Sequence, residues 1–412
     1  LYKGDGIPED KSKAEQYIEI AYQEDKELNF ASFFSEDAEL NKWLNEFKLK
    51  KYINEKKECY NQILRFINDQ DDYDSLSSYL GKLNLSADKN EFKLFIDLII
   101  SVANNHRRHQ SFFKNINQII LYFKEQIKRT FTNFEIFDIF KSNKLILLFL
   151  FENDIIKIDK RIYIELIRLT EPNGIKYCDF FFPEIKRYEE NENNNYIDIK
   201  GLNNKLNKII NFDKKRHIGE NGSYLCFLIR NDLVEQFDIY AVQENITLTS
   251  NIRPSIFETN SFLNSNNPTL LEYAAFFGSK KIIQYLSDNG IEKTPSFWLY
   301  SIHSGYFENK TKELKYKELL VESIKCHHND VAYFIESNFE ELDMGKSRKE
   351  ENIIKSILQY HNYPYFSFEN MKSYDLFYLC QKCYYQIVNF LLRTKEDIIK
   401  KTMIDQISAK IF

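Results

Sequence analysis

The apolar and polar positions of residues 269–291 follow the pattern of two short, consecutive helices. Thr269 and Glu272 have the spacing of a capping box, in which a hydroxyl and a carboxylate each satisfy a backbone N–H left free at a helix start. Gly278 stands where a helix commonly ends in a left-handed residue. The positions that face a core at helical spacing are small or apolar: Leu271, Ala274, Ala275, Ile282, Ile283, Tyr285 and Leu286. Helices this short need packed neighbours, because nucleation costs more than a few hydrogen bonds return.

The same pattern recurs at three other places in the chain. Phe237 lies 49 residues before Leu286, Ile335 lies 49 residues after it, and Leu391 lies 105 residues after it. When each copy is aligned on Leu286, the positions that face the core are again small or apolar. They are Leu225, Cys226, Leu233 and Val234 in the first copy, Leu320, Ile324 and Val331 in the second, and Leu376, Cys380, Ile387 and Val388 in the third. Self-similar helix-turn-helix units predict a stacked array in which each unit contacts mainly its neighbours.

The repeated unit resembles an ankyrin repeat, whose consensus runs T-P-L-H-x-A-A-x-x-G-H-x-x-I-V-x-L-L. Residues 269–286 follow this consensus, with Leu270 in place of the proline and Glu272 in place of the histidine. Because the observed spacings exceed one repeat of about 33 residues, we expect degenerate units in between, one of them at residues 294–305. The resemblance implies an all-α solenoid of degenerate ankyrin repeats over residues 211–412.

The start of the chain resembles the second half of a Sel-like repeat. Its residues 1–22 place two glycines in a turn, a proline before a helix and three residues on one helical face: Gly4, Gly6, Pro8, Ala14, Tyr17 and Ala21. One such unit cannot bury itself, so we expect further repeats before Leu1. We assign residues 1–34 to the end of this repeat.

Residues 35–188 predict a helical domain, because glycine and proline are sparse and apolar residues recur at a 3.6-residue period. Two stripes show this period, Phe92, Phe95, Ile96, Ile99 and Val102, and Ile116, Ile119, Ile120, Phe123 and Ile127. Residues 101–120 and 178–185 resemble a helical region found ahead of ankyrin repeats in a large set of protist proteins. The polar run EENENNNY at residues 189–196 predicts a linker, which we extend over residues 189–210.

The composition narrows the choice of partner and compartment. The 56 basic and 61 acidic residues give a net charge of −5, so no global field favours nucleic acid. The longest apolar run, residues 145–151, is far below the roughly 18 residues that suggest a membrane span. Cys226, Cys326 and Cys380 fall in or beside core slots, which favours reduced thiols and a cytoplasmic location.

Three clusters have side chains that could carry chemistry. Cys380 and Cys383 have the C-x-x-C spacing of half a zinc site or a redox pair, but both also fill repeat positions. Cys326-His327-His328 offers ligand types, yet aligns with an inter-helix turn. The run His106 to His109 could bind a phosphate or form a solvated helix end. The chain lacks the usual nucleotide-binding, metalloprotease and hydrolase motifs. We therefore predict no catalysis, no cofactor and no metal site.

The predicted function is protein binding or scaffolding. In ankyrin arrays the two residues after the Ala-Ala slot project towards the concave face, which is the usual binding surface. By this resemblance the predicted partner-binding residues are Phe227, Leu228, Phe276, Phe277, His303, Lys325, Gln381 and Lys382. Alternatively, the phenylalanines pack against the helical domain. The rival function is that of a regulatory or targeting region of a larger enzyme, such as a protein kinase whose catalytic domain precedes residue 1.

Overall fold

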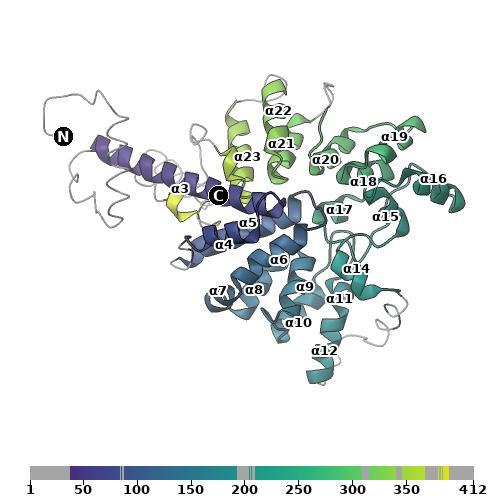
Figure 1. Ribbon diagram of the computed structural model, residues 1–412, viewed down its shortest axis with the longest axis horizontal. Coiled ribbons are helices and arrows are strands. Elements are labelled where there is room, and N and C mark those ends of the chain that lie inside the picture. Colours follow the sequence, from purple (N-terminus) through teal and green to yellow (C-terminus); the bar gives the residue numbers. More distant parts are fainter. Residues whose placement is uncertain are drawn as a thin grey trace, which may run out of the picture. The chain divides into compact units, whose positions relative to one another are not determined.

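All regular elements of the described residues are helices (Figure 1). The computed structural model describes residues 38–83, 85, 88–192, 204, 206, 209–308, 315–339, 346–366, 379, 382 and 384–388. Within these ranges the only β-type pairings are two isolated bridges, Thr170 with Lys176 and Asn251 with Thr269. The predicted all-α class is thereby confirmed.

Ten helices precede residue 193 in this part of the chain. They are α3 (Ala38–Ile67), α4 (Tyr73–Leu80), α5 (Lys89–Asn105), α6 (Phe112–Tyr122), α7 (Lys124–Thr130), α8 (Asn133–Phe140), α9 (Lys144–Glu152), α10 (Lys160–Arg168), α11 (Tyr177–Phe180) and α12 (Phe182–Glu192). The helices that follow in the described ranges are α14 (Phe212–Ile218), α15 (Tyr224–Arg230), α16 (Val234–Gln243), α17 (Ser261–Asn266), α18 (Leu270–Phe277), α19 (Lys280–Asp288), α20 (Pro295–His303), α21 (Tyr316–Lys325), α22 (Asn329–Phe339), α23 (Lys346–Gln359) and the 3₁₀ turn η1 (Tyr363–Tyr365).

The chain divides into two compact units. One contains Leu1–Asn54 and Asp375–Phe412, of which the structure describes the first part of α3 and a few residues between 379 and 388. The predicted Sel-like repeat, residues 1–34, lies outside the described residues. The other unit, Glu55–Tyr374, contains every site discussed below except Gln381 and Lys382.

The helices between α4 and α12 have the apolar cores that their periodicity predicts. All residues of both stripes, on α5 and on α6 with the adjoining α7, are buried. The rings of Phe92, Phe95, Phe123 and Phe131 contact one another at centroid distances of 5.0 to 6.4 Å. A capping box begins α8, where Thr132 and Glu135 each satisfy a backbone N–H of the other.

The start and stop signals of residues 269–291 are present as predicted. Thr269 and Glu272 form the capping box of α18, and Gly278 ends that helix at a φ of 70°. Leu271, Ala274 and Ala275 on α18 are buried, as are Ile282 and Leu286 on α19. Two short helices therefore form where the sequence indicates them.

From α15 onward, most of the helices form pairs, and successive pairs pack on one another (Figure 1). Helix α15 contacts α16 and α18, α16 contacts α19, α18 contacts α20, and α21 contacts α20, α22 and α23. Polar groups join successive helix pairs: Asp232 accepts hydrogen bonds from the backbone N–H groups of Lys281 and Ile282, and the Ser279 hydroxyl donates to the Ile229 carbonyl. These bonds stabilise the start of α19 from the preceding pair, because the first N–H groups of a helix lack partners within it.

Residues on both sides of the predicted linker 189–210 lie in the same compact unit. Arg216 on α14 pairs with Glu184 on α12, and Arg108 after α5 donates to the Gly219 carbonyl and the Thr259 hydroxyl. Lys144 on α9 pairs with Glu171 and donates to the Ile256 carbonyl. The helical region and the helices from α14 onward are therefore joined by buried polar contacts.

Replacing Gly219 with alanine should lower the free energy of unfolding by about 2 to 4 kcal/mol. Its φ of +69° costs an L-residue about 1 to 2 kcal/mol, and the added Cβ would lie 2.9 Å from a methyl carbon of Leu145. Gly290 is the matched control, because its φ is +80° but no atom lies within 4 Å of an added Cβ. Urea unfolding should show a smaller loss for Gly290→Ala. Equal losses would show that the contact with Leu145 is not tight.

Candidate functional site

The eight residues predicted to bind a partner lie in very different environments. Phe227 is 45% exposed and Lys382 is exposed, whereas Leu228, Phe276 and His303 are buried. Phe277 and Lys325 have intermediate exposure, and Gln381 lies outside the described residues. Phe227 is therefore the predicted aromatic residue that presents the largest surface to solvent.

Helix α17 explains why Phe276 and His303 are buried. The ring of Phe262 on α17 lies 6.2 Å from the ring of Phe276 and 4.2 Å from that of His303, measured between centroids. The Lys325 ammonium lies 5.1 Å from the centroid of the same ring. The segment that packs on these positions is thus a six-residue helix between α16 and α18, which the sequence pattern did not predict.

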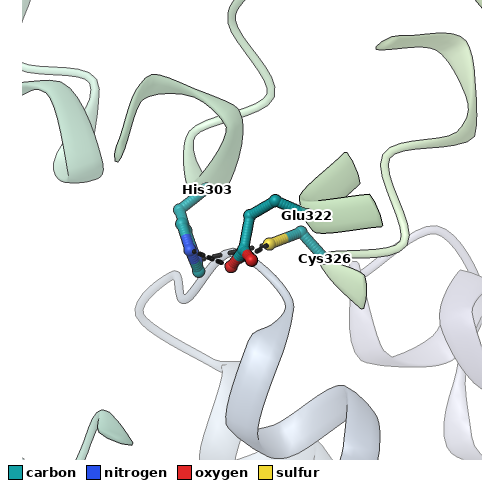
Figure 2. A group of neighbouring side chains, drawn as sticks. All are labelled: His303, Glu322 and Cys326. Atoms are coloured by element: carbon teal, nitrogen blue, oxygen red, sulfur yellow. Dashed lines mark hydrogen bonds and ion pairs between the residues drawn. The ribbon is translucent and has the colours of Figure 1, made fainter. Parts of the chain in front are cut away.

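His303, Glu322 and Cys326 form a buried polar cluster between α20 and α21 (Figure 2). The His303 Nε2 atom is 2.9 Å from a Glu322 carboxylate oxygen, and His303 Nδ1 is 3.3 Å from the Cys326 sulfur. Lys325 Nζ lies 2.8 Å from the same carboxylate oxygen. Glu322 and Cys326 lie one turn apart on α21, so both reach the His303 ring at the end of α20.

The ionisation of this cluster follows from burial and pairing. Burial raises the pKa of Glu322, but His303 and Lys325 outweigh it and hold that pKa at about 2. Burial lowers the pKa of His303 and raises the pKa of the Cys326 thiol well above its ordinary value. Near pH 7 the cluster therefore holds one ion pair, Glu322 with Lys325, beside a neutral imidazole and a neutral thiol.

The same groups could in principle bind a metal or form a nucleophilic pair. A thiolate, an imidazole and a carboxylate are zinc ligands, and a cysteine next to a histidine is the arrangement of a thiol nucleophile. Here the Glu322 oxygen already binds Lys325, and burial disfavours the thiolate that either chemistry requires. With a neutral thiol donating to Nδ1 and Nε2–H donating to Glu322, every group has a partner. The cluster fits a structural role between α20 and α21.

A second polar cluster joins the C-terminal end of α5 to the turn between α21 and α22. His106 Nδ1 is 3.1 Å from the Cys326 carbonyl oxygen, and its ring centroid is 6.4 Å from that of His327 and 5.4 Å from that of His328. Two sequence clusters, His106 to His109 and Cys326 to His328, thus meet in space. Their separation by more than 200 residues left no local signal of this contact.

A pocket of about 400 Å³ lies between the turn at residues 172–173 and the segment 252–268, which includes α17. Asparagine side chains, prolines and Tyr273 contribute to its lining, together with the buried Glu258 carboxylate. That carboxylate accepts hydrogen bonds from the backbone N–H groups of Asn221 and Asn260. These contacts account for both carboxylate oxygens within the protein itself.

An exposed aromatic surface lies on the helix pair α15–α16. Tyr224 and Phe227 on α15 stack at a centroid distance of 6.1 Å, and Tyr240 on α16 meets Tyr224 edge-on at 5.1 Å. Tyr224 is 52% exposed, and Ile239 and Val242 on α16 are more exposed still. We call Tyr224, Phe227 and Tyr240 the α15–α16 aromatic surface. Phe227 belongs both to this surface and to the residues predicted from the repeat pattern.

Comparison with known proteins found no matching family model, no similar curated protein and no similar solved structure. No helix in the described ranges has both the length and the apolar character needed to cross a bilayer. The four described cysteines, Cys59, Cys178, Cys226 and Cys326, are buried and form no disulfide.

Proposed function

We propose that this protein binds another protein, and that the α15–α16 aromatic surface is the contact region. The observation that carries the proposal is the solvent exposure of Tyr224 and Phe227, two large rings that stack on each other but remain about half exposed. Tyrosine is enriched among residues that dominate binding energy, and pre-packed rings lose little conformational freedom when a partner binds.

We further propose that α15 to α23 are degenerate ankyrin-type units. The support is the recurrence of the sequence pattern and the packing of the pair α15–α16 on the pair α18–α19, of α18 on α20 and of α20 on α21. In such arrays a terminal unit usually carries a polar outer face. An apolar face on α15–α16, the first pair of this series, therefore favours binding to a partner over capping.

The charge near this surface defines the partner's chemistry. Residues 231–252 contain no lysine or arginine, whereas they contain Asp232, Glu235, Asp238 and Glu244. Glu235, Asp238 and Glu244 are exposed. Complementarity therefore favours a partner segment that combines apolar anchor side chains with basic residues.

Selection of peptides from a displayed random library against the whole chain tests this proposal. The expected peptides combine lysine or arginine with aromatic or aliphatic residues. The double variant Tyr224→Ser/Phe227→Ser should bind them at least about 30-fold more weakly, because loss of an interface hot spot costs about 2 kcal/mol or more.

Tyr333→Ser provides the matched control, because Tyr333 on α22 is 51% exposed but belongs to another helix pair. This variant should bind the selected peptides like the wild type. The proposal would be overturned if the double variant kept wild-type affinity, or if the selected peptides were acidic.

A further inference from the structure

His327 occupies the turn between α21 and α22 and is surrounded by groups from three other segments. Its Nδ1 atom lies 3.0 Å from the Tyr60 hydroxyl on α3, and its Nε2 atom lies 3.5 Å from the Ser101 hydroxyl on α5. The Ser101 proton goes to the Tyr360 carbonyl, so Ser101 is placed to accept from Nε2–H while Tyr60 donates to Nδ1. These two hydrogen bonds satisfy both nitrogens of the neutral imidazole. A second ring proton, on Nδ1, would point at the hydroxyl proton that Tyr60 donates.

The two neighbouring histidines differ in what their ring nitrogens face. His328 directs Nε2 at the His303 carbonyl, at 3.3 Å, while its ring lies close to Gly305, where an added Cβ would be 3.3 Å from Nδ1. His106 directs Nδ1 at the Cys326 carbonyl oxygen and Nε2 at the Asn68 side-chain oxygen, so both of its nitrogens face acceptors. A charged His106 would repel any charge on His327 or His328, whose ring centroids are 6.4 and 5.4 Å away.

The charged groups around the turn leave His327 without a counter-ion. Glu322 pairs with Lys325 and with His303, and Asp330 acts on His328. Arg107 and His109 add positive or potentially positive charge beside His106, while Asp69 lies 3.4 Å from His109. His361 adds a further imidazole near His327. In the part of the unit that the structure describes, His106, His327 and His328 form no ion pair.

We propose that His327 and His328 form an acid-sensitive latch, which holds the α21–α22 turn against α3 and α5 while the two rings are neutral and releases it when they are protonated. The contacts of His327 define the latch, since this one ring connects α21–α22 with both Tyr60 and Ser101. Release would free the turn from the helical region while the covalent chain stays intact.

The direction of the pH effect follows from the state of the rings. Burial lowers the pKa of His327 well below its ordinary value and lowers the pKa of His328 to about 4. A released histidine titrates near pH 6.5, so the open form binds more protons below that pH. The latch is therefore fully closed above about pH 6.5 and weakens as the pH falls. Each histidine changes the ratio of closed to open forms by up to about tenfold per pH unit.

Hydrogen exchange of the full chain at pH 7.5 and pH 5.5 tests the latch. After correction for the intrinsic effect of pH, amides of residues 324–332 should lose about 100-fold in protection at pH 5.5, because His327 and His328 both contribute. Amides of α8 to α10 are the internal reference and should change much less. Unchanged protection at residues 324–332, or equal loss of protection in all helices, would overturn the proposal.

The variant His327→Asn measures the contribution of His327 to the pH dependence independently of His328. Asparagine does not titrate and tolerates the φ of +60° at this position. It should reduce the pH dependence at residues 324–332 from about 100-fold to about tenfold, whereas His217→Gln, at an exposed histidine paired with Glu152, should leave it at 100-fold. If His327→Asn kept the 100-fold pH dependence of amide protection, the role assigned to His327 would be wrong. If His327→Asn does not fold, the wild-type exchange profile still decides the proposal.

Discussion

Replacing Arg216 with methionine is expected to lower the free energy of unfolding by about 3 to 5 kcal/mol. Arg216 and Glu184 lie 2.5 Å apart, and their side chains are only 4% and 9% exposed. Methionine fills much of the same volume but leaves the Glu184 carboxylate buried without its main counter-ion. The guanidinium also donates to the Phe180 carbonyl and lies near the Phe180 and Phe212 rings. Denaturant unfolding at pH 7 measures the loss.

A double substitution distinguishes the loss of the Arg216–Glu184 ion pair from the change in side-chain volume. Arg216→Met combined with Glu184→Leu removes both charges, so most of the lost stability should return, since a buried pair contributes little over an apolar pair of similar size. The surface pair Lys141–Asp138, with side chains 38% and 55% exposed, provides a control, and Lys141→Met should cost less than about 1 kcal/mol. A cost below 1 kcal/mol for Arg216→Met would show that Glu184 is solvated or neutral.

The sequence predicts those features that depend on neighbouring residues. Thr269 and Glu272 are three residues apart, and the capping box between them forms as the spacing predicts. Gly278 adopts the left-handed conformation that ends α18. The stripe on α5, which includes Phe92 and Val102, is buried because helical geometry puts these residues on one face. Local chemistry is sufficient for helix bounds of this kind.

The contacts between distant segments could not be predicted in this way. The repeat register places Phe276 at a surface position, but Phe262 of α17 packs against it. Helix α17 has six residues and no clear period, so nothing in the pattern marks it as a covering element. His106 and the Cys326 carbonyl are 220 residues apart in the sequence. Only the packing of the folded chain brings their two clusters together.

The buried ion pairs gave no sequence signal for a different reason. Lysine, arginine and glutamate are common in this chain, with 56 basic and 61 acidic residues in all. Nothing in the sequence separates Glu184 or Glu322, which are paired and largely buried, from exposed glutamates on the same kind of helix. A charge's partner is fixed by tertiary structure, which periodicity does not encode.

Replacing Glu322 with glutamine is expected to lower the free energy of unfolding at pH 7 by about 2 to 3 kcal/mol. Glutamine keeps the shape and one acceptor oxygen for His303 and Lys325, so the change removes mainly the negative charge. The pKa of Glu322 is about 2 in the fold against an ordinary value of 4.5. At about 1.4 kcal/mol per unit the whole shift corresponds to about 3.5 kcal/mol, and part of it comes from the hydrogen bond with His303, which glutamine keeps. Because burial keeps the His303 ring neutral near pH 7, the charge partner is the Lys325 ammonium, which the variant leaves without a counter-ion.

The pH dependence of this cost distinguishes Glu322 from the histidines. A carboxyl group whose pKa is lowered by folding contributes its stability above its unfolded pKa and loses it as the pH falls towards the folded value. The difference between wild type and Glu322→Gln should therefore stay constant from pH 8 to pH 5.5. Glu318→Gln, on the same helix but in an exposed pair with Lys315, should cost less than about 0.5 kcal/mol. A cost for Glu322→Gln that appeared only below pH 6.5 would instead assign the charge partner to a protonated His303.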